Sequence, residues 1–227
     1  MIAAPTHHLD DDVLLTYVAG TATEPVALIV ACHLTLCALC RTRAQAAETV
    51  GGAILDAAPA ADLSENALER MLARLDESPT DAPPVANAPF EFAGIPLPRP
   101  LAHYLLPDQG GHHQAPPDFR FLAPGIRGID LPVKADAVVR TRLLRLAPGV
   151  AIPRHTHAAP EFTLVFSGGI SDGGAHYVRG DVRFRDTDDE HVQVVDADGP
   201  CIALVLNEGA LVPKTWGGRV LSFLFDR

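Results

Sequence analysis

The sequence has 227 residues, 48% of them hydrophobic and 20% charged, which excludes global disorder and allows one large or two small folded domains. Its formal net charge of −10 argues against direct binding to nucleic acid, because contacts with phosphate need a basic surface. The start of the chain lacks the basic and apolar regions of a signal peptide, and the longest apolar stretch, residues 25–40, is shorter than the roughly 20 residues of a membrane helix. We therefore expect a cytoplasmic protein that does not contact a membrane.

Two helical segments are expected before the glycine pair at residues 51–52. In residues 9–20, three consecutive aspartates favour the positive end of a helix, and Gly20 is of a type that commonly ends one. The second segment starts near Thr23, with Pro25 in the first turn, where its missing N–H is not needed. It continues toward the glycine pair, and a break near its cysteines is compatible with the pattern.

A third helix is expected over residues 64–76, where apolar side chains recur at helical spacing on one face. Together the three segments predict an all-α helical bundle over residues 1–78. This part of the chain is acidic, since residues 1–76 contain ten acidic and four basic side chains. We therefore expect a partner of this module to present a basic surface.

The rest of the chain changes character twice. Residues 79–100 are rich in proline and small residues, which is typical of a semi-extended linker. Residues 101–227 hold short runs rich in Val, Leu and Phe between turn signals, as in an antiparallel barrel or sandwich. The clearest of these expected strands are residues 138–146, 162–166, 181–185 and 201–206.

Three of the four cysteines lie within nine residues, which is poor spacing for disulfides and good spacing for a metal site. His33, Cys37 and Cys40 form an H-x3-C-x2-C pattern that brings the three side chains together on one helix face or across a turn. Zinc prefers four nitrogen or sulfur ligands in a tetrahedron, and His7 or His8 can supply the fourth. The competing interpretation is that these cysteines are simply small buried apolar residues.

A second group of candidate ligands lies in the expected barrel. Residues 149–168 read G-x5-H-x-H-x3-E-x6-G, which resembles the first motif of the cupin barrels. His155 and His157 point to the same side of a strand and can face the barrel interior with Glu161. His191 falls at the spacing of the second cupin motif, which the sequence matches only in part. Three imidazoles and one carboxylate suit zinc, iron, manganese or nickel, and the ligand types alone do not choose among them.

The segment HHLDDDVLLTYVAGT, followed by the H-x3-C-x2-C pattern, resembles the zinc-binding anti-sigma factors of the ChrR type, and the resemblance continues through the cupin-like region. It implies a zinc site formed by His8, His33, Cys37 and Cys40, and it favours zinc in the barrel as well. Members of this family bind an extracytoplasmic-function sigma factor and hide its polymerase-binding surfaces. The resemblance therefore implies two domains, an all-α zinc-binding module and an all-β cupin barrel of the jelly-roll type, which inhibit a sigma factor and release it on an oxidative-stress signal.

The helical module also offers candidate partner-binding residues. Six apolar residues on the first and third expected helices are candidates for the contact with the sigma factor: Val13, Leu14, Tyr17, Leu68, Met71 and Leu72. The competing interpretation is that these side chains pack within the core of the module. Loss of the structural zinc, or oxidation of its thiolates, is expected to unfold the module and so to release the partner.

An enzyme is the alternative from a different functional class. In that case His155, His157, Glu161 and His191 hold the catalytic metal of a cupin dioxygenase or isomerase, and the helical module regulates it. Against this alternative, no further acid, base or nucleophile stands out beside the motif, and Glu190 is only a weak candidate. A third interpretation is a metal-stabilised binding module without regulated release.

Overall fold

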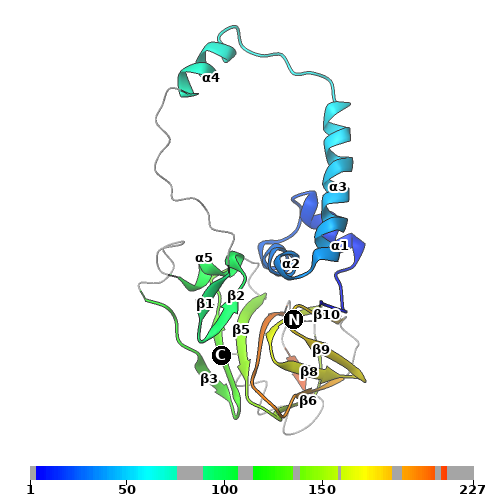
Figure 1. Cartoon of the computed structure of the whole chain (residues 1–227), viewed down its shortest axis with the longest axis vertical. Helices are drawn as coiled ribbons and strands as arrows, with labels where there is room; N and C mark the ends of the chain where they lie inside the picture. Colours follow the sequence, from blue (N-terminus) through cyan, green and yellow to red (C-terminus); the bar gives the residue numbers. More distant parts are fainter. Residues whose placement is uncertain are drawn as a thin grey trace.

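The computed structural model describes most of the chain, with helices in the first third and mainly strands in the remainder (Figure 1). The described residues are 4–75, 89–106, 115–134, 139–157, 160–185, 191–207 and 211–213. Within these ranges the side chains of residues 153–157, 191 and 211–213 are not described.

The first two expected helical segments form three helices. α1 (Asp11–Val18) lies inside the first segment. The second segment forms α2 (Glu24–Leu36) and α3 (Ala38–Asp56), which are bent by 118° at Cys37, so the chain does break at its cysteines. Within the described residues, no single helix has the length and apolar character needed to cross a bilayer, and α2 and α3 meet that test only when they are taken together across the bend.

The C-terminal half of α3 and the whole of α4 (Ala67–Leu75) extend away from the rest of the molecule (Figure 1). α3 continues through the glycine pair at residues 51–52 to Asp56, although each glycine costs about 1 kcal/mol relative to alanine. The buried residues of α3 are Cys40 and Ala44, both near its start, and no residue of α4 is buried. The apolar side chains on these parts are therefore left uncovered by the described chain.

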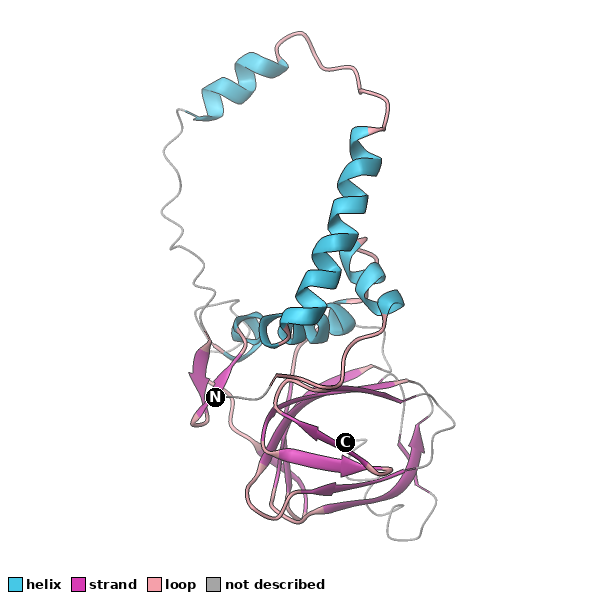
Figure 2. Cartoon of the chain, turned by 45° about the vertical axis from the view of Figure 1, so that its right-hand side comes forward, coloured by secondary structure: helices cyan, strands magenta, loops and turns pink. Residues whose placement is uncertain are grey.

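Two antiparallel sheets enclose the barrel, and Figure 2 shows them closing below the helices. The six-stranded sheet has the order β10-β7-β12-β5-β4-β3, with β3 (Arg120–Ala123), β4 (Ile126–Asp130), β5 (Arg140–Leu146), β7 (Glu161–Ser167), β10 (Val182–Arg185) and β12 (Cys201–Asn207). The five-stranded sheet has the order β13-β6-β11-β8-β9, with β6 (Ala151–His157), β8 (Gly169–Asp172), β9 (Ala175–Val178), β11 (His191–Val195) and β13 (Leu211–Pro213). The expected all-β barrel is confirmed, and all four expected strands are present.

Part of the segment that we expected to be a linker is folded. β1 (Phe90–Phe92) and β2 (Ile95–Leu97) form a hairpin, and the 3-10 turn η1 (Arg99–Leu101) leads into the short helix α5 (Ala102–Leu105). Both phenylalanines of β1 and the leucine that ends β2 are buried. The proline within β2 is tolerated because a two-stranded hairpin consists only of edge strands. The expected end of the linker is therefore too late, and residues 76–88 lie outside the described part.

One hydrophobic core joins the helices to the barrel. The same buried cluster contains Ile29 and Cys32 of α2 and Leu204 of β12. At the edge of this core, the hydroxyl of Tyr104 donates a hydrogen bond of 2.6 Å to a carboxylate oxygen of Glu24. α2 is apolar on most sides because it packs against α1 and α3 on one side and against the barrel on another. The barrel therefore sets the position of the helix that carries part of the candidate site.

Candidate metal centre

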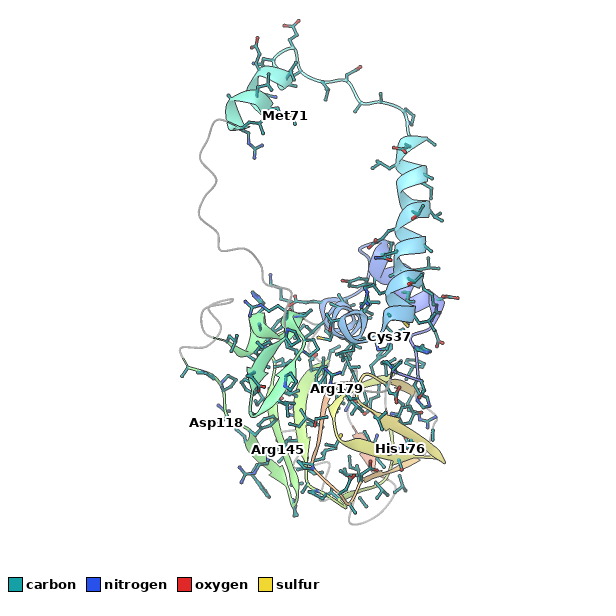
Figure 3. The ribbon with its side chains drawn as sticks, in the orientation of Figure 1. Cys37, Met71, Asp118, Arg145, His176 and Arg179 are labelled. Atoms are coloured by element: carbon teal, nitrogen blue, oxygen red, sulfur yellow. The ribbon has the colours of Figure 1, made fainter. Side chains whose placement is uncertain are left out.

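The four ligands expected at the N-terminal site come together in the folded chain. One possible donor atom from each of His8, His33, Cys37 and Cys40 lies within 4.8 Å of all the others. A tetrahedral zinc ion with bonds of about 2.0–2.3 Å separates its ligand atoms by roughly 3.3–3.8 Å, so a small contraction of this cluster suffices. Figure 3 places Cys37 where the helices meet the barrel.

The bend between α2 and α3 brings the two cysteines together with His33. Cys37 ends α2 and is also the N-cap of α3, with an extended backbone at φ −112° and ψ 107°. Its Sγ accepts a hydrogen bond from the backbone N–H of Cys40 at 3.4 Å. A helix N-terminus carries a partial positive charge, which favours the negative charge of a thiolate once it binds a metal. His33 lies in the last turn of α2, and His8 approaches from the extended segment before α1.

His33 is set up to offer one ring nitrogen to a metal. The ring is fully buried, and its Nδ1 lies 2.9 Å from the carbonyl oxygen of Gly180 in the barrel. Because a carbonyl can only accept, Nδ1 must carry the hydrogen, and Nε2 is left with its lone pair. Nε2 is buried and has no hydrogen-bond partner within the described residues. Burial lowers the pKa of His33 to about 4, so the ring is neutral at physiological pH, as a metal ligand must be.

The thiols have a polar environment suited to a bound cation. Cys37 Sγ lies 3.3 Å from Nδ1 of His8. Arg43 donates to the carbonyl of Leu9 at 2.8 Å and approaches Cys40 Sγ at 3.7 Å, which orients the second cysteine. Burial raises the pKa of Cys40, and the neighbouring Cys37 raises it further, so metal binding is coupled to the release of protons from the thiols.

This donor set fits zinc. Two imidazole nitrogens and two thiolates form a closed four-ligand site, and such sites are structural rather than catalytic. The set is also assembled from separate pieces of chain, namely the segment before α1, the end of α2 and the start of α3. A bound ion would therefore fix how these three pieces are arranged.

The barrel cluster is described only in part. His155 and His157 lie in β6, and His191 begins β11. The two strands pair, with His191 opposite His155, so the backbone brings these positions together. Their side chains lie outside the described part of the structure. Glu161 is the exception, since it begins β7 and its side chain is buried inside the barrel. The four-residue barrel site is therefore still a prediction.

Glu161 has a neighbour that the sequence pattern did not indicate. The guanidinium of Arg183 in β10 forms ion pairs with Glu161 and with Asp172, and all three side chains are buried. With its carbonyl oxygen turned toward Arg183, the amide of Gln193 accepts from both terminal nitrogens at 2.6 Å. A cavity of 40 Å³ lies beside this network, lined in part by Glu161, Gln193 and Asn207. Any metal held by Glu161 would share that carboxylate with an arginine.

The candidate partner-binding residues differ in exposure. Leu14 is only 2% exposed and packs in the core, so the expectation that it is available to a partner is wrong, and Leu15 is exposed in its place. In a helix of eight residues, two adjacent leucines leave the orientation of the apolar face ambiguous. Val13 and Tyr17 are partly buried against the same core. The remaining three candidates are exposed and lie on α4: Leu68, Met71 and Leu72.

Comparison with known proteins covers the helices and the barrel alike. Residues 112–210 match the family described as the ChrR Cupin-like domain. The chain is 35% identical over 205 residues to the anti-sigma-E factor ChrR of Cereibacter sphaeroides, covering 90% of this chain and 91% of that protein. It also resembles the crystal structure of Rhodobacter sphaeroides SigE in complex with the anti-sigma ChrR, with a TM-score of 0.72 and 33% identity over 90% of this chain and 99% of that one.

Proposed function

Because the chain belongs to the ChrR family of anti-sigma factors, we propose that its helices bind an extracytoplasmic-function sigma factor and thereby inhibit it. The observation that carries this proposal is the cluster of His8, His33, Cys37 and Cys40, which lies at the bend between α2 and α3, where a bound ion would fix how the helices are arranged. A sigma factor acts on RNA polymerase, so we place the protein in the cytoplasm.

Two uncovered apolar faces support the binding role. On α4, four large apolar side chains recur at helical spacing and are between 51% and 72% exposed: Leu68, Met71, Leu72 and Leu75. On the distal half of α3, Val50 and Ile54 lie one turn apart and are also exposed. Monomeric proteins rarely leave such faces in water, and amphipathic helices of this kind bind in apolar grooves of partners. Figure 3 shows Met71 on α4, away from the barrel.

The charge of the helical module favours the same class of partner. Residues 1–76 carry ten acidic and four basic side chains. Sigma factors contact DNA through basic surfaces, which an acidic module can attract and cover. Attraction of this kind mainly speeds association, so the apolar faces supply the affinity.

For the barrel we propose a second metal site, held by His155, His157, Glu161 and His191, with zinc or another divalent metal. The backbone pairing of His191 with His155 and the burial of Glu161 support it. We further propose that the barrel senses an oxidative signal and that the sigma factor is then released.

Binding can be tested with substitutions on the uncovered face of α4. The full-length chain is co-purified with candidate sigma factors. A double variant that carries Leu68→Asp and Met71→Asp is compared with a control, Phe121→Asp, which alters an exposed apolar residue on barrel strand β3. We expect the α4 double variant to lose capture of the sigma factor, because a charge is placed in a desolvated contact, and the control to keep it. Equal capture by both variants would contradict the proposed surface.

A separate assay addresses the enzyme alternative. Consumption of dioxygen with a small diketone is measured for the chain loaded with iron, manganese or nickel. The sensor proposal predicts no turnover above that of the free metal. Steady turnover that disappears in Glu161→Ala would favour the enzyme.

A further inference from the structure

One carboxylate of the barrel holds the segment that supplies His8. Asp181, which immediately precedes β10, is fully buried. Its Oδ1 accepts hydrogen bonds from the backbone N–H groups of Thr6 at 2.6 Å and His7 at 2.9 Å. Its Oδ2 accepts from the backbone N–H of Val178 at 2.9 Å, which fixes the carboxylate within its own turn. The chain is thus attached to the barrel at the two residues before the expected ligand.

His7 makes further contacts with the barrel. The backbone N–H of Val182 donates to the carbonyl of His7 at 3.3 Å, so the segment adds to the start of β10. The ring of His7 lies against Tyr177 with a centroid separation of 4.3 Å. Nδ1 of this ring is 3.5 Å from Oδ2 of Asp181. His7 therefore contacts the barrel through its backbone and its ring, while His8 faces the cysteines.

The residue beside this carboxylate holds the second imidazole. The carbonyl of Gly180 accepts the hydrogen bond from Nδ1 of His33 at 2.9 Å. Gly180 has a φ of 91°, and a Cβ at this position would lie 2.6 Å from Cγ of Pro5. Both the backbone conformation and the close approach of the N-terminal segment therefore require glycine here.

We propose that Gly180 and Asp181, which we call the anchoring turn, position both imidazole ligands, so that the affinity of the N-terminal site for its metal depends on contact with the barrel. This inference rests on the zinc site proposed above. Cys37 and Cys40 are held by the junction of α2 and α3. The ring of His33 bonds directly to the barrel, and the chain leading to His8 is held there through the backbone of His7. A movement of the turn would therefore release the ring of His33 and the segment before His8 from their present positions.

The anchoring turn also lies close in sequence to the barrel cluster. Arg183, two residues beyond Asp181, forms the ion pairs with Glu161 and Asp172. A change at Glu161 would act on β10, whose first residue follows the turn directly. The barrel can in this way influence how tightly the helical module holds its metal.

Cobalt(II) provides a probe that is specific for the N-terminal site. Thiolate ligands give cobalt an intense charge-transfer absorption, which a barrel site of histidines and a glutamate cannot produce. We would titrate the full-length chain with cobalt and compare Asp181→Asn with Asp196→Asn, a matched change at a barrel aspartate that pairs with His176. His7→Ala tests the same contact from outside the barrel, since this ring is 35% exposed. Circular dichroism checks that each barrel is folded.

We expect Asp181→Asn to weaken cobalt binding at the thiolate site by about 10- to 100-fold, the usual effect of losing a group that orients a ligand. His7→Ala should weaken it in the same direction, and neither variant should change the shape of the spectrum, because the four ligands remain. Asp196→Asn should match the unaltered chain. Equal affinity in all four proteins would overturn the role of the anchoring turn, whereas absence of the thiolate band in the unaltered chain would overturn the zinc site itself.

Discussion

Removal of the N-terminal metal should unfold α1 while α2 stays in place. The side chain of α1 that is fully buried is Leu14, and Leu9, just before the helix, is buried beside it. Burial of these two leucines stabilises the folded helix by roughly 3–6 kcal/mol, at about 1.5–3 kcal/mol for each. Ordering the eight residues of this helix costs about 8 kcal/mol or more, at about 1 kcal/mol per residue. Without the metal the balance for α1 is therefore unfavourable by a few kcal/mol.

α2 differs because the barrel holds it. Leu28, Ile29 and Val30 are buried in the core that continues into the six-stranded sheet. Hydrogen exchange followed by mass spectrometry, with zinc and with a chelator, separates the two helices. We predict that chelation removes amide protection from α1 and from the first turn of α3 but not from α2 or β12. Loss of protection in α2 to the same extent as in α1, or unchanged protection in α1, would refute this reasoning.

Two substitutions test the contacts around the anchoring turn and the barrel interior. Arg183→Met should lower the free energy of unfolding by about 3–5 kcal/mol, because the carboxylates of Glu161 and Asp172 would be left buried and close together without a cation. Urea unfolding measures this change, and a loss below about 1 kcal/mol would contradict the prediction. Gly180→Ala should cost about 1–3 kcal/mol, because the backbone is left-handed and the new methyl group meets Pro5, and a thermal midpoint unchanged from that of the parent would contradict it.

The N-terminal ligands could be predicted because metal chemistry restricts both residue type and spacing. Cys37 and Cys40 at x2 spacing with His33 four residues earlier left few other interpretations, and either a helix or a turn brought them together. The family resemblance then chose His8 over His7, and in the structure it is His8 that joins the cluster.

Contacts between distant parts of the chain could not be predicted in this way. Glu161, Asp172 and Arg183 are separated by 11 or more residues. They meet because β7 pairs with β10 and because β8, in the other sheet, lies across the barrel from them, and a local pattern specifies neither arrangement. The apolar sequence of α2 fits a helix buried in a bundle equally well, so its packing against the barrel was missed. The proline content of residues 79–100 likewise predicts a linker. The hairpin within it was missed because the burial of β1 depends on residues that come much later in the sequence.

The central claim is that a metal held by two imidazoles and two thiolates organises the helices that bind the sigma factor. The most direct measurement is the affinity of the full-length chain for its sigma factor, determined by calorimetry. It compares the zinc-loaded protein with a double variant that carries both Cys37→Ser and Cys40→Ser. The account predicts that the double variant loses one equivalent of zinc and binds the sigma factor at least about 100-fold more weakly, a loss of about 2.7 kcal/mol or more. A double variant that lacks this zinc yet binds with undiminished affinity would contradict it.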